Sequence, residues 1–224
     1  MEIITPSAVI ETPESHIEDY ARLLERFGRT SHPTDGPISD ESASAFLRRY
    51  AIELGHESLL EHCVVSARFI CDRSASHQLV RHRLGSYTQE SQRVSDYSAS
   101  GIRVICPPTI RQDAARFTAW KDAVERAESA YRTLLAAGAP PEDARAVLPN
   151  CTKTELVATF NLRQWRHVFI QRALNPRAQW QIRELMTDLL KQLVGLLPSV
   201  FGDLQQKILY RLVFEDTKNI PAKD

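Results

Sequence analysis

The sequence predicts an α+β domain that is rich in helices and contains a small, mostly antiparallel sheet. Long stretches carry apolar residues at helical spacing, whereas only short stretches alternate apolar and polar residues as strands do. The 224 residues suffice for one large domain with an ample core, and no stretch looks like a linker. We therefore predict a single domain over residues 1–224, with an unassigned tail from about residue 207 that is prone to fray.

The expected elements follow from these patterns. Helices are expected at residues 13–27, 40–55, 70–83, 112–137, 142–147, 161–173 and 178–197, and Pro198 is expected to stop the last of them. Strands are expected within residues 1–10, 63–70, 102–106 and 154–160.

Caps and stops set the boundaries in the first half of the chain. Pro13 suits a first helical position, and Ser39 suits the cap of the second helix, which Gly55 is expected to end. Residues 63–70 alternate apolar and polar side chains, which predicts a strand with one buried face. The helix that follows is expected to carry the triplet Arg81-His82-Arg83 in its last turn and to lead into a polar loop.

The longest predicted helix, at residues 112–137, has an apolar stripe from Phe117 to Leu135. Such a stripe is typical of a core or a subunit contact. Gly138 is expected to end this helix, and Pro141 to begin the next. On the helix from residue 161, polar and charged side chains are expected to share one broad face, opposite an apolar face directed to the core.

Composition argues against several classes of protein. Basic and acidic residues balance at 28 each, unlike most nonspecific nucleic-acid binders. No apolar run of about 18 residues and no leader is evident, so a cytoplasmic protein without membrane contact is expected. The four cysteines are scattered without a CxxC pair, which favours free thiols and no metal site.

Residues 81–93 read RHRLGSYTQESQR and concentrate charged and hydrogen-bonding groups. Arginines give forked, permanently charged donors, and Ser and Gln add further polar groups, which suits a ligand with phosphates and a carbonyl-rich ring. The alternative is a solvated basic helix end. A loop anchored on a rigid helix favours ligand binding instead.

The triplet with Ser91 resembles the signature of the flavin-dependent thymidylate synthases. Other motifs of this family are present and occur in the order that the family has: residues 55–62 (GHESLLEH), 145–149 (RAVLP) and 161–163 (NLR). His167 and Arg172 also match the family. The resemblance extends from about residue 20 to about residue 200. It implies the family fold and a homotetramer with the flavin between subunits, which agrees with the absence of a Gly-rich dinucleotide fingerprint.

The resemblance also implies a set of site residues. The catalytic residues would be Arg172, Ser91 and His56, with Arg172 as the group that activates the uracil ring. The flavin would be held by Ser58, Arg81, His82, Arg83, Gln89, Asn161, Arg163 and His167. The nucleotide would be held by Gln78, Arg81, Gln89, Glu90, Ser91, Gln92, Arg93, Arg145 and Arg172. For Arg145, a surface ion pair with Glu142 is the simpler alternative.

Two routes can make carbon 5 of a uracil ring nucleophilic. One adds a Cys thiolate to carbon 6, but the Pro-Cys-His setting of that class is absent, and Cys106 is followed by Pro107. In the other, an Arg pairs with the charge that develops on the ring. The implied cofactor is FAD, with methylenetetrahydrofolate and NADPH as co-substrates; the cofactors supply the redox chemistry.

The identity of the substrate is left open between two nucleotides. Val94 stands directly after Arg93, where family members carry an aromatic residue. Valine can neither stack nor donate a hydrogen bond, so UMP, methylated in a specialised pathway such as nucleoside antibiotic synthesis, is the alternative to dUMP. A nucleic-acid-binding module is disfavoured by the balanced charge, and an inactive scaffold by the retained Arg172 and Ser91.

Overall fold

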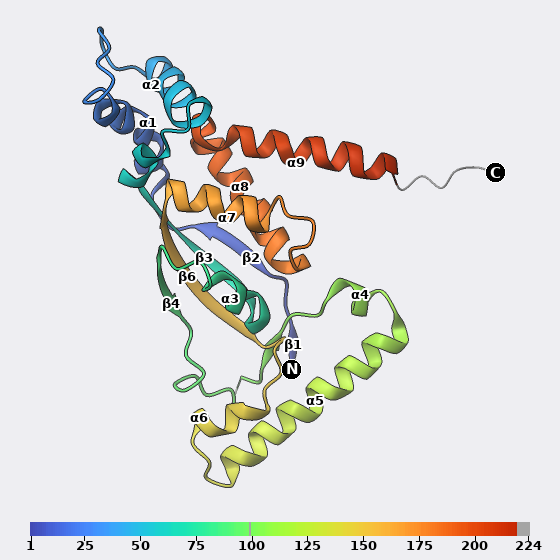
Figure 1. Ribbon diagram of the computed structural model, residues 1–224. Coiled ribbons are helices and arrows are strands. Elements are labelled where there is room, and N and C mark those ends of the chain that lie inside the picture. The colour runs from blue at the N-terminus through green and yellow to red at the C-terminus, as the bar shows by residue number, and fades with distance from the viewer. Residues whose placement is uncertain (99, 219–224) are drawn as a thin grey trace, which may run out of the picture. The chain divides into compact units, whose positions relative to one another are not determined.

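A computed structural model describes residues 1–98 and 100–218 of the chain, with side chains up to residue 208. The protein is helix-rich with a small antiparallel sheet, as predicted (Figure 1). The sheet has four strands in the order β2 (Ser7–Ile10), β3 (Val64–Asp72), β6 (Lys153–Asn161) and β4 (Ser86–Gln89). A separate parallel pair joins β1 (Glu2–Ile3) to β5 (Arg103–Val104), with Glu2 opposite Arg103. None of the helices in the described residues is long and apolar enough to cross a bilayer.

The chain divides into two compact units. Unit 1 comprises Met1–Ser7, Phe69–Arg81 and Tyr87–Val157. Unit 2 comprises Ala8–Arg68, His82–Ser86 and the chain from Ala158 onward. The boundary between the units falls within two strands: β3 passes from unit 2 to unit 1 after Arg68, and β6 passes from unit 1 to unit 2 after Val157. The bounds of a single domain, 1–224, stay a prediction.

Unit 1 contains α5 (Ala114–Ala136), which is the longest helix within the described residues (Figure 1). It also contains the short helices α3 (Arg73–Leu79), α4 (Pro108–Arg111) and α6 (Pro141–Ala144) and the 3-10 turn η3 (Arg145–Val147). The predicted stripe of α5 is buried at Val124, which packs with Ile102 and Val104. Glu128 of α5 accepts hydrogen bonds from the Met1 ammonium (2.7 Å) and from the Ile102 amide (3.0 Å). The carboxylate therefore ties the starts of both paired segments to this helix.

Unit 2 contains α1 (Glu14–Gly28), α2 (Asp40–Leu47), the π-helical turn η1 (Arg48–Glu53), the 3-10 turn η2 (Glu57–His62), α7 (Leu162–Arg172), α8 (Trp180–Leu196) and α9 (Pro198–Lys218). Its core is apolar, and α7 buries Trp165, Val168 and Phe169 as predicted. The indole N–H of Trp165 donates to the Val65 carbonyl at 2.9 Å, so its polar atom is satisfied within the core.

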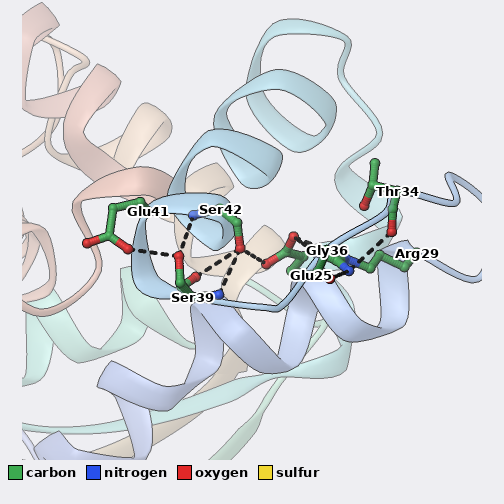
Figure 2. A network of polar contacts seen from close by, with 7 residues as sticks. All are labelled: Glu25, Arg29, Thr34, Gly36, Ser39, Glu41 and Ser42. Carbon is green, nitrogen blue, oxygen red and sulfur yellow. Dashed lines mark hydrogen bonds and ion pairs between the residues drawn. The ribbon is translucent and has the colours of Figure 1, made fainter.

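A polar network fixes the connection between α1 and α2 (Figure 2). Ser39 caps α2 as predicted, and it forms a reciprocal capping box with Ser42. The Ser42 hydroxyl also donates to Glu25 of α1 at 2.8 Å. Glu25 accepts from Arg29 at 2.7 Å on its other oxygen, so the end of α1 and the start of α2 share one carboxylate.

The structure corrects several predicted boundaries. Residues 70–72 belong to β3, because the Asp72 side chain caps α3 by accepting from the Ala75 amide at 2.7 Å. The triplet at 81–83 consequently lies beyond the end of α3 and not in its last turn. The polar loop that follows the triplet contains strand β4, and the first ten residues form two strands instead of one.

The C-terminal region differs most from the prediction. Pro198 was expected to stop the last helix, yet it begins α9, which continues to Lys218. Proline has no N–H to donate and is well accommodated in the first helical turn, so the same residue can end one helix and start another. The unassigned tail from residue 207 is thus helical as far as Lys218, and residues 219–224 lie outside the described part of the chain.

Candidate active site

The predicted site residues fall into two groups according to the unit that holds them. Unit 1 holds Gln78, Arg81, Gln89, Glu90, Ser91, Gln92, Arg93 and Arg145. Unit 2 holds His56, Ser58, His82, Arg83, Asn161, Arg163, His167 and Arg172. Most of the residues expected to bind the nucleotide thus belong to unit 1, and most of those expected to bind the flavin belong to unit 2.

In unit 1, Ser91 begins a tight turn directly after β4. Its carbonyl accepts from the amides of Val94 (3.1 Å) and Ser95 (2.9 Å), and its hydroxyl accepts from the Arg93 amide at 3.3 Å. The side chains of Ser91 and Arg93 are both exposed. The turn therefore presents a hydroxyl and a guanidinium to solvent, a donor pair that suits a phosphate.

Two of the three arginines of this group, Arg93 and Arg145, meet at Glu142 of α6. The Arg93 Nε donates to the Glu142 carboxylate at 2.8 Å, and the Arg145 Nε donates to the Glu142 carbonyl at 3.0 Å. Arg145 thus contacts the backbone of Glu142 and does not form the ion pair that was considered for it. The Glu142 carboxylate is paired with Arg93 instead. Because Arg93 and Glu142 are 66% and 46% exposed, their ion pair is weak and open to competition by an anion.

Glu90 is surrounded by protein donors. One carboxylate oxygen accepts from Lys153 (2.9 Å) and from the Glu155 amide (3.1 Å), and the other accepts from the Tyr97 hydroxyl (3.2 Å). Burial, and then the charge of Glu90, raise the pKa of Tyr97 to about 12, so this hydroxyl stays protonated and donates. Glu90 therefore braces the chain that carries Ser91; direct contact with a nucleotide stays a prediction.

The amide of Gln89 is also fixed by the protein. Its Nε2 donates to Ser76 (2.9 Å) and Thr154 (3.1 Å), which defines the orientation of the side chain. Gln92 is buried, whereas Arg81 is exposed after the end of α3. The Gln78 side chain of α3 donates to the Ser74 carbonyl at 3.3 Å.

Val94 is 82% exposed, so the aromatic residue that it replaces in the family would also face solvent in unit 1. Tyr97, three residues later, packs against the Ile102–Val104–Val124 cluster and is bonded to Glu90. Its ring is therefore part of the core of unit 1 and does not substitute for an exposed aromatic side chain at position 94.

In unit 2, the last residue of α7 bonds to the triplet. The Arg172 Nε donates to the His82 Nε2 at 3.1 Å. His82 is only 8% exposed, and burial, followed by the charges of Arg172 and His167, lowers its pKa from 6.5 to about 4. His82 is consequently neutral at neutral pH, with its proton on Nδ1, because Nε2 must offer a lone pair to Arg172.

His167 completes this cluster. It lies on α7, and its ring contacts the His82 ring edge-on, with centroids 5.9 Å apart. The structure thus brings together His82, His167 and Arg172. These residues come from separate sequence motifs, and His82 and Arg172 are 90 residues apart in the chain.

A cavity of about 560 Å³ lies beside α7 in unit 2. It is lined by Glu57, Glu61, Leu84, Asn161, Arg163, Gln164, Arg166, His167 and Ile170. Three of these residues, Asn161, Arg163 and His167, were predicted to bind flavin. Leu84 and Ile170 are exposed apolar side chains, so the cavity combines apolar surface with polar groups.

Arg163 is held in this cavity by two carboxylates. Its Nη1 donates to Glu61 at 2.6 Å, and its Nε lies 3.5 Å from Glu57. Arg166, one turn further along α7, is buried between Glu57 (3.5 Å) and Asp203 of α9 (2.6 Å). The sequence did not single out Glu57, Glu61 or Asp203. For Glu57 and Glu61, their spacing in GHESLLEH was the one feature of the sequence that could have indicated a role in the site. The arginines that they contact lie about a hundred residues away in the chain.

Asn161, His56 and Ser58 complete the group in unit 2. The Asn161 Oδ1 accepts from the Gln164 amide at 2.8 Å and caps α7, the helix that was predicted to begin at residue 161. Ser58 is exposed on the turn η2. The His56 ring lies against His32, a residue that was not predicted to belong to the site, with Nδ1 at 3.2 Å from the His32 Nε2.

The cysteines lie outside these groups and are free thiols. Burial raises the pKa of Cys63 to about 11 and that of Cys71 to about 12. These thiols are protonated at neutral pH and are poor nucleophiles. Within the described residues, no cluster of three or more His, Cys, Asp or Glu side chains is arranged to hold a metal ion.

Comparison with known proteins identifies the family. The model of the family described as thymidylate synthase complementing protein matches residues 8–199. A flavin-dependent thymidylate synthase from Geobacter sulfurreducens is 38% identical over 167 residues, which are 74% of this chain and 71% of that protein. The chain belongs to the flavin-dependent thymidylate synthase family.

Other relatives agree with this membership, which makes the chain an enzyme of the methyltransferase class. A flavin-dependent thymidylate synthase from Pyrococcus furiosus is 37% identical over 177 residues, covering 78% of this chain and 72% of that family member. The crystal structure of PolB from Streptomyces cacaoi, described as a UMP/dUMP methylase bound with 5-Br UMP, has a TM-score of 0.73 and 21% identity. It covers 92% of this chain and 97% of PolB, and supports the family fold.

Proposed function

We propose that this enzyme methylates carbon 5 of the uracil ring of dUMP and so produces dTMP. Methylenetetrahydrofolate donates the carbon, FAD is the bound cofactor, and NADPH is the reductant. The observation that carries this proposal is the Arg172–His82 bond, because it fixes a guanidinium whose position in the family motif is that of the uracil-activating residue.

Arg172 stabilises the negative charge that develops on the uracil ring when nitrogen 3 loses its proton. This charge raises the electron density at carbon 5, which then attacks the one-carbon unit. A donor that is already oriented needs no reorganisation at the moment of reaction, and loss of one such donor typically costs ~2.7–4 kcal/mol of transition-state stabilisation. His82 supplies this orientation by accepting from the Arg172 Nε. No cysteine is required, in agreement with the protonated state of the buried thiols.

The cavity beside α7 has the chemistry that a flavin requires. Its volume of about 560 Å³ lies within the range of small-molecule sites, and it offers apolar surface from Leu84 and Ile170. Asn161, Arg163 and His167 contribute amide, guanidinium and imidazole groups that suit ring carbonyls and phosphates. When FAD is bound, it supplies the hydride that converts the transferred carbon into a methyl group. Asn161, Arg163 and His167 hold and orient the flavin in this proposal. Ser58, His82 and Arg83 contribute to the same task.

Ser91 and Arg93 hold the phosphate of the nucleotide in this proposal. Their exposed hydroxyl and guanidinium suit the oxygens and the negative charge of a phosphate. Arg93 can release Glu142 at little cost in free energy, because their ion pair is solvated.

We further propose the homotetramer with sites at subunit interfaces that the family implies. Light scattering of the purified protein tests this assembly: a tetramer agrees with it and a monomer contradicts it.

The direct test is reconstitution and turnover. The purified protein is expected to bind FAD, to be yellow, and to oxidise NADPH faster when dUMP and methylenetetrahydrofolate are added. Mass spectrometry should detect dTMP with the carbon of labelled methylenetetrahydrofolate on its methyl group. A protein that retains no FAD after reconstitution, or that forms no methylated nucleotide, would contradict the proposal.

A second candidate substrate is UMP, with 5-methyl-UMP as the product. Its support is Val94, which is 82% exposed and lacks the ring that family members carry after Arg93, while Tyr97 is committed to the core of unit 1. PolB, which shares the fold, is described as acting on both UMP and dUMP. Turnover of the two nucleotides at equal concentration decides between them, and strict preference for dUMP eliminates this candidate.

A further inference from the structure

His32, in the loop between α1 and α2, packs directly on the predicted site residue His56. The two imidazole rings are stacked with centroids 5.1 Å apart and an interplanar angle of 19°. The His32 Nε2 lies 3.2 Å from the His56 Nδ1, within hydrogen-bond distance. His32 also stacks on Tyr50 with centroids 4.4 Å apart, and the Tyr50 ring lies 6.3 Å from the His56 ring. The His32 ring therefore has both packing contacts and a polar contact, and its polar contact is with His56.

The loop that carries His32 is fixed by Arg29 (Figure 2). The Arg29 Nη1 donates to the carbonyls of Thr34 (3.2 Å) and Gly36 (2.7 Å), while its other nitrogens bond to Glu25. The amide of His32 itself donates to the Gly28 carbonyl at the end of α1, at 2.9 Å. The backbone on both sides of His32 is thus anchored, so the ring has a defined place from which to act on His56.

The backbone of His56 is anchored as well. Its amide donates to the Tyr50 carbonyl at 2.9 Å, directly after Gly55, whose positive φ of 75° ends the preceding turn. His56 is exposed, however, so nothing in its own backbone contacts determines the rotation of its ring. The contact with His32 is the hydrogen bond that can select one ring orientation.

We infer that His32 is a positioning residue that sets the ring orientation and the tautomer of His56. A bond between two imidazole nitrogens requires one N–H and one lone pair, so each ring state selects that of its neighbour. With Nδ1 engaged by His32, Nε2 of His56 remains as the nitrogen that can meet a ligand. The functional part of this inference rests on the proposed function, because His56 is expected beside the flavin and substrate.

Three variants separate positioning from simple packing. His32→Phe keeps an aromatic ring on Tyr50 but removes the polar contact, and His32→Gln restores a hydrogen-bonding group near the place of Nε2 without the ring. His32→Ala removes both. His16→Phe is the matched control, because His16 is an exposed histidine of α1 in the same unit.

The first measurement is nitrogen NMR of the labelled histidines in the intact protein, which reports the tautomer of His56 and needs no turnover. We expect the His56 signals to shift in His32→Phe and to return towards the wild type in His32→Gln, with no change in His16→Phe. Unchanged His56 signals in both His32→Phe and His32→Ala would overturn the inference. This outcome is independent of the proposed reaction, whose own failure would be the absence of methylated product from the wild type.

The second measurement is turnover combined with thermal unfolding. If His32 acts through His56, His32→Phe lowers kcat by roughly tenfold with little change in Tm, and His32→Gln recovers most of it. The same substitution should have no added effect in a His56→Ala background. A purely structural role predicts the reverse pattern: a lower Tm in His32→Gln and His32→Ala, unchanged kcat in His32→Phe, and effects that add to those of His56→Ala.

Discussion

Replacing His82 by leucine is expected to impair catalysis through Arg172. The substitution removes the acceptor for the Arg172 Nε at a position that is 8% exposed, where water cannot readily replace it. A hydrogen bond to a charged group contributes about 1.5–3 kcal/mol, so kcat/KM should fall roughly 10- to 150-fold. His82→Gln keeps an acceptor and should lose less. Flavin content must be measured in each variant, because His82 is also a predicted flavin contact.

The pH dependence of stability provides an independent check on His82. Its folded-state pKa of about 4 is below its ordinary value of 6.5, so the folded protein binds fewer protons than the unfolded chain between these values. The stability contribution of neutral His82 is therefore complete above about pH 6.5 and is lost as the pH falls towards 4. Urea unfolding of the wild type and His82→Gln across this range measures it. Parallel stability profiles for the two proteins would refute the assigned neutral state.

Three further outcomes are expected. Asp203→Ala leaves the buried Arg166 without its closest carboxylate and should lower the free energy of unfolding by about 3–5 kcal/mol, measured in urea; a loss below 1 kcal/mol would contradict this. Glu61→Gln frees Arg163 from its 2.6 Å partner and should tighten FAD binding roughly twofold to fivefold, whereas weaker binding in a flavin titration would be inconsistent. Cys106→Ser should retain full turnover, and inactivity with an unchanged Tm would argue for a cysteine nucleophile.

Local sequence signals predicted the fold well where one element depends on its own residues. Ser39 was recognised as a helix cap because a side-chain acceptor near the first free amides is a local feature. The start of α3 was misplaced because residues 70–72 are apolar or small enough for either structure, and the Asp72 cap was overlooked. Helix α9 was missed because Pro198 was taken only as a stop.

The site residues themselves were predicted from the family motifs, but their protein partners were not. His32, Lys153 and Asp203 are separated from the groups they contact by 24 or more residues, and no periodic pattern links them. Tertiary contacts of this kind appear only once the chain is folded. The roles given to the individual site residues in binding and catalysis stay predictions.

The central claim is that a guanidinium held by His82 activates the uracil ring. It is tested most directly by comparing Arg172→Ala with the wild type in single-turnover methylation of dUMP and UMP, using protein with equal FAD content. The account predicts loss of methyl transfer to both nucleotides, by roughly a hundredfold or more, while NADPH still reduces the bound flavin. Methyl transfer by Arg172→Ala at the wild-type rate would contradict it.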